Sequence, residues 1–303
     1  MDFKNIFKTF FLGLVFVGIC GFFVFSALFL FSDVNKENLS LASISESALV
    51  KYKPQRNWDM PDLDPYAVSS LAIDYNLTGE DKILLSKNAK AVLPIASLTK
   101  LMSAVIVLDS YNLEYVTTVS KEADKQYSVL QDISESDKLS LKNLLEIMLV
   151  ASSNKSAYAL AEVMGREKFV ELMNAKAKYI GLENTSFFDP AGLSDKNQST
   201  AEDLAKLAEY ILNNYPQVSH ITKLKQIDIP NEGQFNNTNE LLAQLPDTAI
   251  SKTGFTIEAK GCMLLVESNQ KTQGYLIYVI LGADDRSSVI LSLINWTKSA
   301  YLW

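Results

Sequence analysis

The longest hydrophobic stretch of the chain lies near its start and predicts a membrane-spanning helix. Residues 10–31 are almost uninterruptedly apolar, with Ser26 as the only clearly polar position. A helix rises about 1.5 Å per residue, so this stretch would extend over roughly 33 Å, enough to cross a bilayer core of about 30 Å. Lys4 and Lys8 precede it and Asp33 follows it. The positive-inside bias therefore predicts a cytoplasmic N-terminus and an extracytoplasmic remainder of the chain.

A cleaved signal peptide is the competing interpretation, because Val24-Phe25-Ser26 before Ala27 could serve as a cleavage site. Signal-peptide cores usually have only about 7–15 apolar residues, fewer than this stretch has. We therefore expect an uncleaved signal anchor over residues 1–32. A polar linker rich in Ser, Asn and Lys is expected over 33–62, followed by one domain over 63–303.

The first part of this domain is predicted to hold one hairpin and several helices. Short apolar runs over 68–75 and 82–85 flank a polar turn, which predicts a β-hairpin. The run over 98–108 is apolar almost all round and predicts a buried helix that starts at Ser97. A further amphipathic helix is predicted by apolar residues at helical spacing, namely Leu141, Leu144, Leu145, Met148 and Leu149.

Later segments extend this pattern and then change its period. Helices are expected over about 156–164 and 168–179, and from Thr200, whose side chain with Asp203 resembles a capping box. Strands are expected over 249–253, 262–267 and 275–281, and a final helix over about 286–301. Strands at both ends with helices between them favour a mixed α+β domain, whose antiparallel sheet is completed by the C-terminal strands.

Composition and charge narrow the functional classes. Roughly 240 residues beyond the linker are enough for one substantial domain with its own core. The formal net charge of −7 argues against nucleic acid as a partner. Cys20 lies in the apolar stretch and Cys262 in the outer domain, so we expect no disulfide. The single histidine, His220, excludes two-histidine zinc peptidases, and its neighbours carry no nucleophile-elbow pattern.

Three short motifs carry the candidate chemistry, in this order along the chain: Ser97-Leu98-Thr99-Lys100, Ser152-Ser153-Asn154 and Lys252-Thr253-Gly254. A lysine three residues after a serine falls on the same face of a helix, about 5–6 Å away at Cβ. The motif is weak alone, because Ser-x-x-Lys also occurs at Ser152 and Ser268. Ser97 differs because it opens a predicted buried helix, whose N-terminal N–H groups favour a developing anion. With one histidine in the chain, a serine acyl-transfer enzyme would have to use a lysine as its base.

The ordered trio resembles the signature of penicillin-binding proteins and serine β-lactamases, and in particular the low-molecular-mass D-alanyl-D-alanine carboxypeptidases of peptidase family S11. Flanking segments also match, at 94–96, 187–193, 199–205, 237–242 and 255–256. The resemblance implies a β-lactamase/transpeptidase-like fold, with an antiparallel sheet flanked by helices and an all-helical part. Two departures, Ala191 for histidine and Ser153 for glycine, bear on substrate preference more than on activity.

The first two motifs would then form the reacting centre. A serine hydroxyl is a poor nucleophile at neutral pH and needs an adjacent base. Lysine can be that base only if its pKa falls well below about 10.4, through burial and a neighbouring cation. We therefore hypothesise that Ser97 attacks the substrate carbonyl and that Lys100 accepts its proton. Ser152 would relay a proton to the leaving amine, and Asn154 would hydrogen-bond the substrate amide and hold Lys100 in place.

The resemblance assigns the third motif to substrate binding. Lys252 would provide positive potential for the terminal carboxylate of the substrate, and Thr253 would donate a hydrogen bond to it. Gly254 would let the backbone approach closely. The backbone N–H groups of Ser97 and Phe255 would form the oxyanion hole.

These expectations describe a serine-type D-Ala-D-Ala carboxypeptidase that trims peptidoglycan stem peptides through an acyl-enzyme on Ser97. It would be a single-pass protein of a bacterial cell membrane with an extracytoplasmic catalytic domain, and β-lactams would be covalent inhibitors. No metal or cofactor is expected. A D,D-endopeptidase of the same family is the alternative. A β-lactamase is less favoured, because Leu182-Glu183-Asn184 lacks the Glu-x-x-Leu-Asn spacing of class A enzymes. A non-catalytic peptidoglycan-binding relative is less favoured because the chemical residues are intact.

Overall fold

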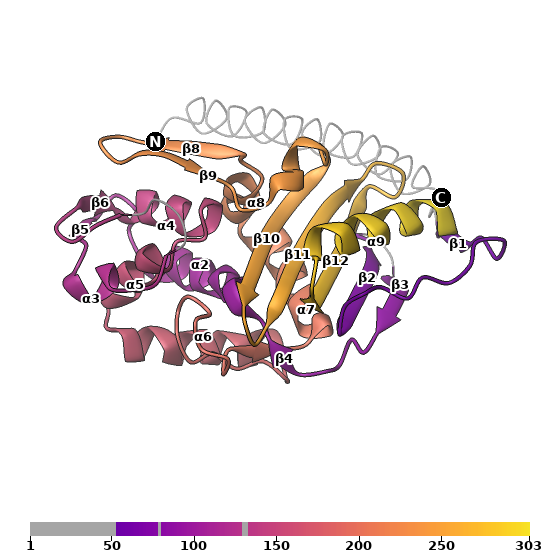
Figure 1. Ribbon diagram of the computed structural model, residues 1–303, viewed down its shortest axis with the longest axis horizontal. Coiled ribbons are helices and arrows are strands. Elements are labelled where there is room, and N and C mark those ends of the chain that lie inside the picture. The colour runs from indigo at the N-terminus through magenta and orange to yellow at the C-terminus, as the bar shows by residue number, and fades with distance from the viewer. Residues whose placement is uncertain (1–52, 78–79, 129–132) are drawn as a thin grey trace, which may run out of the picture. The chain divides into compact units, whose positions relative to one another are not determined.

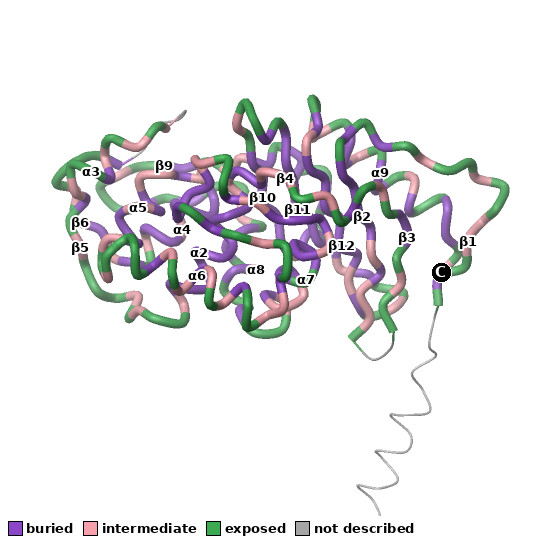
Figure 2. The backbone as a smooth tube through the Cα atoms, turned by 90° about the horizontal axis from the view of Figure 1, so that it is seen from below, coloured by how far each residue is buried: buried purple, intermediate pink, exposed green. Residues whose placement is uncertain are grey.

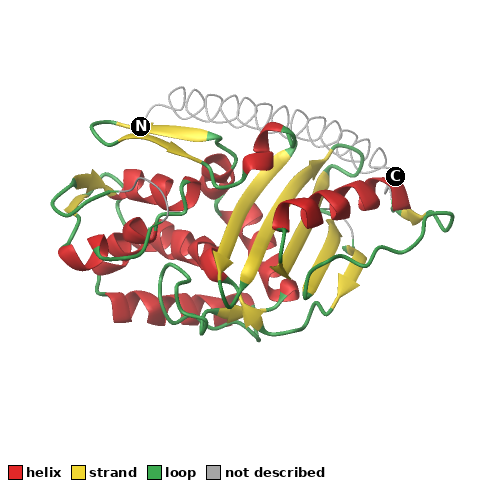
Figure 3. Ribbon diagram, in the orientation of Figure 1, coloured by secondary structure: helices red, strands yellow, loops and turns green. Residues whose placement is uncertain are grey.

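A five-stranded antiparallel sheet forms the centre of the fold, with its strands in the order β10–β11–β12–β2–β3 (Figure 1). Its members are β2 (Ser69–Tyr75), β3 (Lys82–Lys87), β10 (Thr248–Thr256), β11 (Lys260–Asn269) and β12 (Gly274–Ala283). β12 pairs with β2, so the C-terminal strands complete the sheet that the predicted hairpin begins. β10 is left as an edge strand, next to the helical part of the molecule (Figure 3).

The computed structural model describes residues 53–77, 80–128 and 133–303. The predicted membrane-spanning stretch lies outside these ranges. Within them, none of the helices has both the length and the apolar character that spanning a bilayer requires. β1 (Gln55–Arg56) pairs with β13 (Tyr301–Leu302). The strand β1 therefore lies inside the stretch 33–62 that is expected to be a linker.

The central strands are buried along most of their length (Figure 2). Alternate residues along them belong to two different hydrophobic cores, one on each face of the sheet. On β11, Leu264 and Val266 belong to the larger core, whereas Met263 and Leu265 belong to the smaller one. This division follows from the two-residue period of a strand. The C-terminal helix α9 (Arg286–Ala300) covers the smaller core, and α7 (Ala201–Asn214) packs on the sheet from the side of the larger core.

The helical part comprises α2 (Thr99–Ser110), α4 (Leu141–Val150), α5 (Asn154–Glu162), α6 (Arg166–Ile180) and α8 (Pro216–Thr222). The helix α2 is buried from Thr99 to Val107, because α4, α5 and α6 all pack against it. The predicted buried helix is thus confirmed. It begins after a short 3-10 turn, η1 (Ala96–Leu98), rather than at Ser97.

Local hydrogen bonds explain where two predicted boundaries differ from the structure. The helix α5 begins at Asn154 rather than near 156, because Ser153 Oγ accepts from the backbone N–H of Ser156 at 2.9 Å and caps it. Thr200 caps α7 as predicted, with Oγ1 accepting from Asp203 N at 3.1 Å. The carboxylate of Asp203, however, accepts from Asn184 N and Thr185 Oγ1 instead of completing a capping box.

Several short elements have no counterpart among the predictions. They are α3 (Lys121–Asp124), η2 (Glu240–Ala243), and the pairs β4 (Leu93–Pro94) with β7 (Gln198–Ser199), β5 (Val116–Thr118) with β6 (Lys138–Ser140), and β8 (Gln226–Ile229) with β9 (Gly233–Asn236). The predicted α+β class, the antiparallel sheet and the flanking helices are confirmed.

Candidate active site

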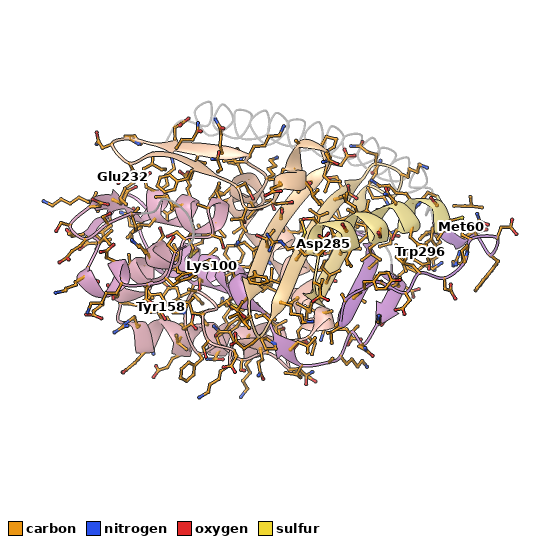
Figure 4. All side chains as sticks on the ribbon, viewed as in Figure 1. Met60, Lys100, Tyr158, Glu232, Asp285 and Trp296 are labelled. Atoms are coloured by element: carbon orange, nitrogen blue, oxygen red, sulfur yellow. The ribbon has the colours of Figure 1, made fainter. Side chains whose placement is uncertain are left out.

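Ser97 and Lys100 meet where η1 runs into α2, close to the edge strand β10. Figure 4 labels Lys100 on the ribbon. The Nζ atom of Lys100 donates a hydrogen bond to Ser97 Oγ at 2.7 Å. The Lys100 side chain is fully buried. The spacing of three residues thus brings a hydroxyl and an amine into direct contact, as expected for one face of a helix.

The backbone around both serines is strained. Ala96, immediately before Ser97, has a φ of +45°, and Ser152 has a φ of +59°. Side chains with a Cβ rarely adopt this left-handed region, and such strain persists only where the surrounding structure enforces it. Two serines of the predicted site are therefore presented by backbone that the fold holds in place.

Lys100 Nζ contacts three oxygen atoms that come from three different parts of the chain. Besides Ser97 Oγ, it donates to Asn154 Oδ1 at 2.7 Å and to the backbone carbonyl of Ala191 at 2.8 Å. An ammonium group has three N–H donors and no acceptor. Each oxygen can thus be matched by one N–H, so the position of Nζ is defined on three sides.

Asn154 is itself oriented by a second bond. Its Nδ2 donates to the backbone carbonyl of Tyr127 at 2.7 Å. This bond turns the amide oxygen toward Lys100 and fixes which end of the side chain faces the lysine. The N-terminus of α5, which begins at Asn154, thereby connects the second motif to the first.

A second serine–lysine pair lies beside the first. Lys252 Nζ donates to Ser152 Oγ at 2.8 Å and to the backbone carbonyl of Thr253 at 3.1 Å. Burial lowers the pKa of Lys252 well below its ordinary value, and the charges of Lys100 and Arg286 lower it further. Lys252 therefore releases a proton more readily than an ordinary lysine, and its immediate hydrogen-bond partner is Ser152.

The edge strand β10 approaches the nucleophile through Gly254. A Cβ on this residue would lie 3.0 Å from the backbone nitrogen of Ser97 and 3.1 Å from Ile95 O. Only a glycine fits this approach without displacing backbone. Because β10 is an edge strand, its side toward η1 has no strand partner, which leaves backbone groups there available to a ligand.

Two further residues line this strand. Thr253 Oγ1 shares a hydrogen bond of 2.6 Å with Thr238 Oγ1. The half-buried Arg286 at the start of α9 points Nη1 at the carbonyl of Gly254, 3.5 Å away. Arg286 adds positive charge beside the two lysines, which suits an anionic group of a substrate.

The structure brings together all eight residues that the motifs single out. Ser97, Lys100 and Asn154 form one hydrogen-bonded group, and Ser152 with Lys252 forms another. Thr253 and Gly254 follow Lys252 along β10, and the Phe255 side chain beyond them is 63% exposed. His220, the single histidine, is exposed on α8. The structure shows no cluster of metal-ligating side chains within its described residues.

Sequence analysis assigned no role to several residues that complete the site. They are the carbonyls of Ala191 and Tyr127, and the side chains of Arg286 and Thr238. Two of them, Ala191 and Thr238, lie in the segments 187–193 and 237–242 that contribute to the family resemblance. That resemblance marked the segments without saying which atoms act.

Comparisons with known proteins identify the family of the chain and relatives of similar sequence and structure. The family model described as D-alanyl-D-alanine carboxypeptidase, peptidase family S11, matches residues 57–285. A D-alanyl-D-alanine endopeptidase of Pseudomonas aeruginosa is 34% identical over 233 residues, which cover 74% of this chain and 74% of that protein. The D-alanyl-D-alanine carboxypeptidase DacF of Bacillus subtilis is 29% identical over 279 residues, covering 87% of this chain and 69% of that protein. Among solved structures, the cefotaxime-bound penicillin-binding protein D2 of Listeria monocytogenes has a TM-score of 0.70 and 27% identity, over 78% of this chain and 99% of that one.

Proposed function

Since the chain belongs to the D-alanyl-D-alanine carboxypeptidase family, peptidase family S11, we propose that it is a serine D,D-peptidase that removes the terminal D-alanine from peptidoglycan stem peptides. One observation carries the proposal: the buried Lys100 amine lies 2.7 Å from the Ser97 hydroxyl. A base in this position can activate the hydroxyl without a histidine.

The first half-reaction forms an acyl-enzyme on Ser97. With Lys100 neutral, Ser97 Oγ attacks the carbonyl carbon of the penultimate D-alanine, and its proton passes to Lys100 Nζ. The oxyanion that develops accepts hydrogen bonds from the backbone N–H groups of Ser97 and Phe255. The close approach of Gly254 to Ser97 N supports this assignment, since it brings the two backbones together.

Collapse of the tetrahedral intermediate breaks the carbon–nitrogen bond and releases D-alanine. Its amine takes a proton from Ser152 Oγ. Lys252 Nζ then supplies a new proton to Ser152 Oγ along the 2.8 Å hydrogen bond. The lowered pKa of Lys252 favours this transfer. A water molecule then attacks the ester carbonyl, and its proton passes through Ser152 to the neutral Lys252. Ser97 Oγ leaves with the proton that Lys100 Nζ holds, which releases the shortened peptide and restores Ser97.

The terminal carboxylate of the substrate binds beside β10. Thr253 Oγ1 donates a hydrogen bond to it, exchanging its present contact with Thr238. Lys252 and Arg286 supply the positive potential. This arrangement selects substrates that carry an anion next to the scissile bond.

A D,D-endopeptidase that cuts peptide crosslinks is the second candidate. It is favoured by the 34% identical relative, which is a D-alanyl-D-alanine endopeptidase. Incubation with a monomeric pentapeptide muropeptide and with a crosslinked dimer, followed by mass spectrometry, separates the two. Release of free alanine from the monomer supports the carboxypeptidase, whereas conversion of dimer into monomers without free alanine supports the endopeptidase.

Covalent labelling by a fluorescent penicillin tests the nucleophile. The cefotaxime-bound relative supports the expectation that β-lactams acylate this protein. The parent and a Ser268→Ala control, which removes the serine of another Ser-x-x-Lys, should both be labelled, and Ser97→Ala should not. An unlabelled parent that is folded and inert toward muropeptides would contradict the proposed function.

The apolar stretch at 10–31 supports an uncleaved membrane anchor, with the catalytic domain on the extracytoplasmic side of a bacterial cell membrane. N-terminal sequencing of protein recovered from washed membranes should find Met1 or Asp2. A new N-terminus near Ala27 would instead indicate a cleaved signal peptide.

A further inference from the structure

A buried carboxylate organises the loop that faces Lys100. We call residues 189–197 the Asp189 loop. Asp189 is buried, and its oxygens accept hydrogen bonds from five N–H groups of this loop: Ala191 N at 2.8 Å, Gly192 N at 2.7 Å, Leu193 N at 3.3 Å, Ser194 N at 2.7 Å and Asn197 Nδ2 at 2.9 Å. Hydrogen bonds to a charged acceptor are stronger than neutral ones. One side chain therefore determines the conformation of this turn.

The Asp189 loop touches α2 at two consecutive carbonyl groups. The carbonyl of Ala191 accepts from Lys100 Nζ at 2.8 Å, and the carbonyl of Pro190 accepts from Ser103 Oγ at 2.6 Å. Lys100 and Ser103 lie three residues apart on the buried face of α2. The loop is thus fixed next to the lysine by a neighbouring bond that does not involve the lysine itself.

The same loop also supports the turn that carries the nucleophile. The carbonyl of Asn197 accepts from Ile95 N at 3.1 Å, just before Ala96 and Ser97. A Cβ on Gly192, whose φ is +85°, would collide with the carbonyl of Ala96. The Asp189 loop is therefore in contact with Lys100 and with the turn that leads directly into Ser97.

We propose that Asp189 is a positioning residue for the Lys100 base: its carboxylate holds the Ala191 carbonyl where it accepts one N–H of Nζ and aims the amine at Ser97. Asp189 does not touch Lys100, Ser97 or the substrate in this role. It acts through the backbone of the loop. The proposal extends the proposed function, because it assigns the residue that maintains the geometry of the base.

Two effects should follow when the loop is released. A carbonyl that accepts from an ammonium favours the protonated lysine. Its displacement should therefore move the protonation of Lys100 to lower pH. Displacement also removes one of the three contacts that define Nζ, so acylation of Ser97 should slow even at a pH where the lysine is neutral.

Asp189→Asn is the first variant. It places an amide NH2 opposite the N–H of Ser194 and the NH2 of Asn197, which are both donors. We expect acylation by fluorescent penicillin to slow about tenfold, consistent with the loss of a charge-assisted bond. Asp189→Asn with Asn197→Asp reverses donor and acceptor in that pair and should recover part of the loss, because the contact with Ser194 N remains unfavourable. Asp203→Asn is the matched control, because Asp203 is also buried and holds Asn184 and Thr185 without contacting the Asp189 loop.

Ser103→Ala separates positioning from charge. It removes the bond to the Pro190 carbonyl and loosens the loop while Asp189 keeps its charge. We expect the same direction of change as in Asp189→Asn, with a smaller size. This variant also carries the test should Asp189→Asn not fold.

The decisive readout is the titration of Lys100 itself, followed by 13C NMR in protein labelled at lysine Cε. The Lys100 signal is assigned by its loss in Lys100→Arg. A midpoint at lower pH in Asp189→Asn and Ser103→Ala, but not in Asp203→Asn, supports the proposal. An unchanged midpoint in both variants, or a shift in Asp189→Asn with none in Ser103→Ala, overturns it. The titration needs no turnover, so failure of the proposed function shows separately, as a parent that neither reacts with penicillin nor cleaves peptides.

Discussion

Gly254→Ala tests whether the close approach of β10 to the nucleophile is needed for acylation. The added Cβ would lie 3.0 Å from Ser97 N, 3.1 Å from Ala96 Cβ and 3.1 Å from Ile95 O. Two of these neighbours are backbone atoms, and Ala96 already has a φ of +45°. The turn therefore cannot absorb the methyl group by a side-chain rotation. The strand and the turn must instead move apart by a few tenths of an ångström.

That movement separates the two backbone N–H groups of the proposed oxyanion hole. Complete removal of one oxyanion donor slows a reaction by about 10²–10³-fold, about 2.7–4 kcal/mol. A small displacement weakens the donors without removing them. We therefore expect the rate of acylation by fluorescent penicillin to fall about 10–100-fold, about 1.4–2.7 kcal/mol in activation free energy. The rate is measured at several penicillin concentrations alongside a thermal melt.

Gly181→Ala is the control for stability. Gly181 ends α6 with a φ of +80°, and a Cβ there would meet no atom within 4 Å. An alanine at this position is strained but distant from Ser97, so it should lower the melting temperature and leave acylation unchanged. Normal acylation by a folded Gly254→Ala protein would refute the inference that this contact sets the geometry of the oxyanion hole.

Three further predictions concern the charged groups. In Lys252→Met, penicillin acylation should fall by about 100-fold or more, because the proton donor is removed. Burial lowers the pKa of Lys252, so near neutral pH the unfolded parent binds more protons than the folded parent. The variant should therefore melt at a higher temperature than the parent at pH 7, and this difference in melting temperature should narrow toward pH 10. A difference in melting temperature that does not change with pH would contradict this. Burial raises the pKa of Asp74 to about 6 from 3.8. In urea unfolding, Asp74→Asn should therefore match the parent at pH 4 and be more stable by up to about 3 kcal/mol at pH 8. An equal difference in unfolding free energy at both pH values would count against a titrating Asp74. Arg56 donates to Met60 O at 2.7 Å, and its guanidinium lies 5.2 Å from the centre of the Trp296 ring. Arg56→Leu should therefore lower the free energy of unfolding by about 1–3 kcal/mol and leave acylation normal. Slowed acylation would show that this end of the chain influences the site.

The sequence specified the parts of the site that depend on local spacing. Ser97 and Lys100 are three residues apart on one helical face, so their contact follows from helix geometry once the helix is predicted. The strands β11 and β12 were predictable because both of their faces are buried and their apolar runs are nearly continuous. The helix α9 was located to within a residue, and its buried apolar residues Val289, Ile290, Leu293 and Ile294 have the three-to-four-residue spacing of an amphipathic helix.

Contacts that depend on the backbone of distant loops could not be predicted. The carbonyl that faces Lys100 belongs to Ala191, and the identity of an alanine says nothing about where its carbonyl points. The position of Arg286 next to Gly254 depends on the pairing of Gly261 with Ala283, a register between strands that the sequence does not display. Strands of two residues, such as β4 and β7, are likewise formed by tertiary pairing and not by any local period.

The two serine–lysine pairs are best understood as one titrating unit. The charge of Lys100 is one cause of the lowered pKa of Lys252, so the site resists carrying two charges at once. A site with one charge has one protonated lysine and one neutral lysine. The neutral amine at Lys100 can take the proton of Ser97, and the protonated amine at Lys252 can supply one to the leaving group through Ser152. After acylation Lys100 is protonated and Lys252 is neutral. Lys252 can then accept a proton through Ser152, and Lys100 can return one to Ser97. The pH dependence of the acylation rate should therefore report apparent pKa values that belong to the pair of lysines. Removing either lysine should convert a pH–rate profile with two titration steps into one with a single step.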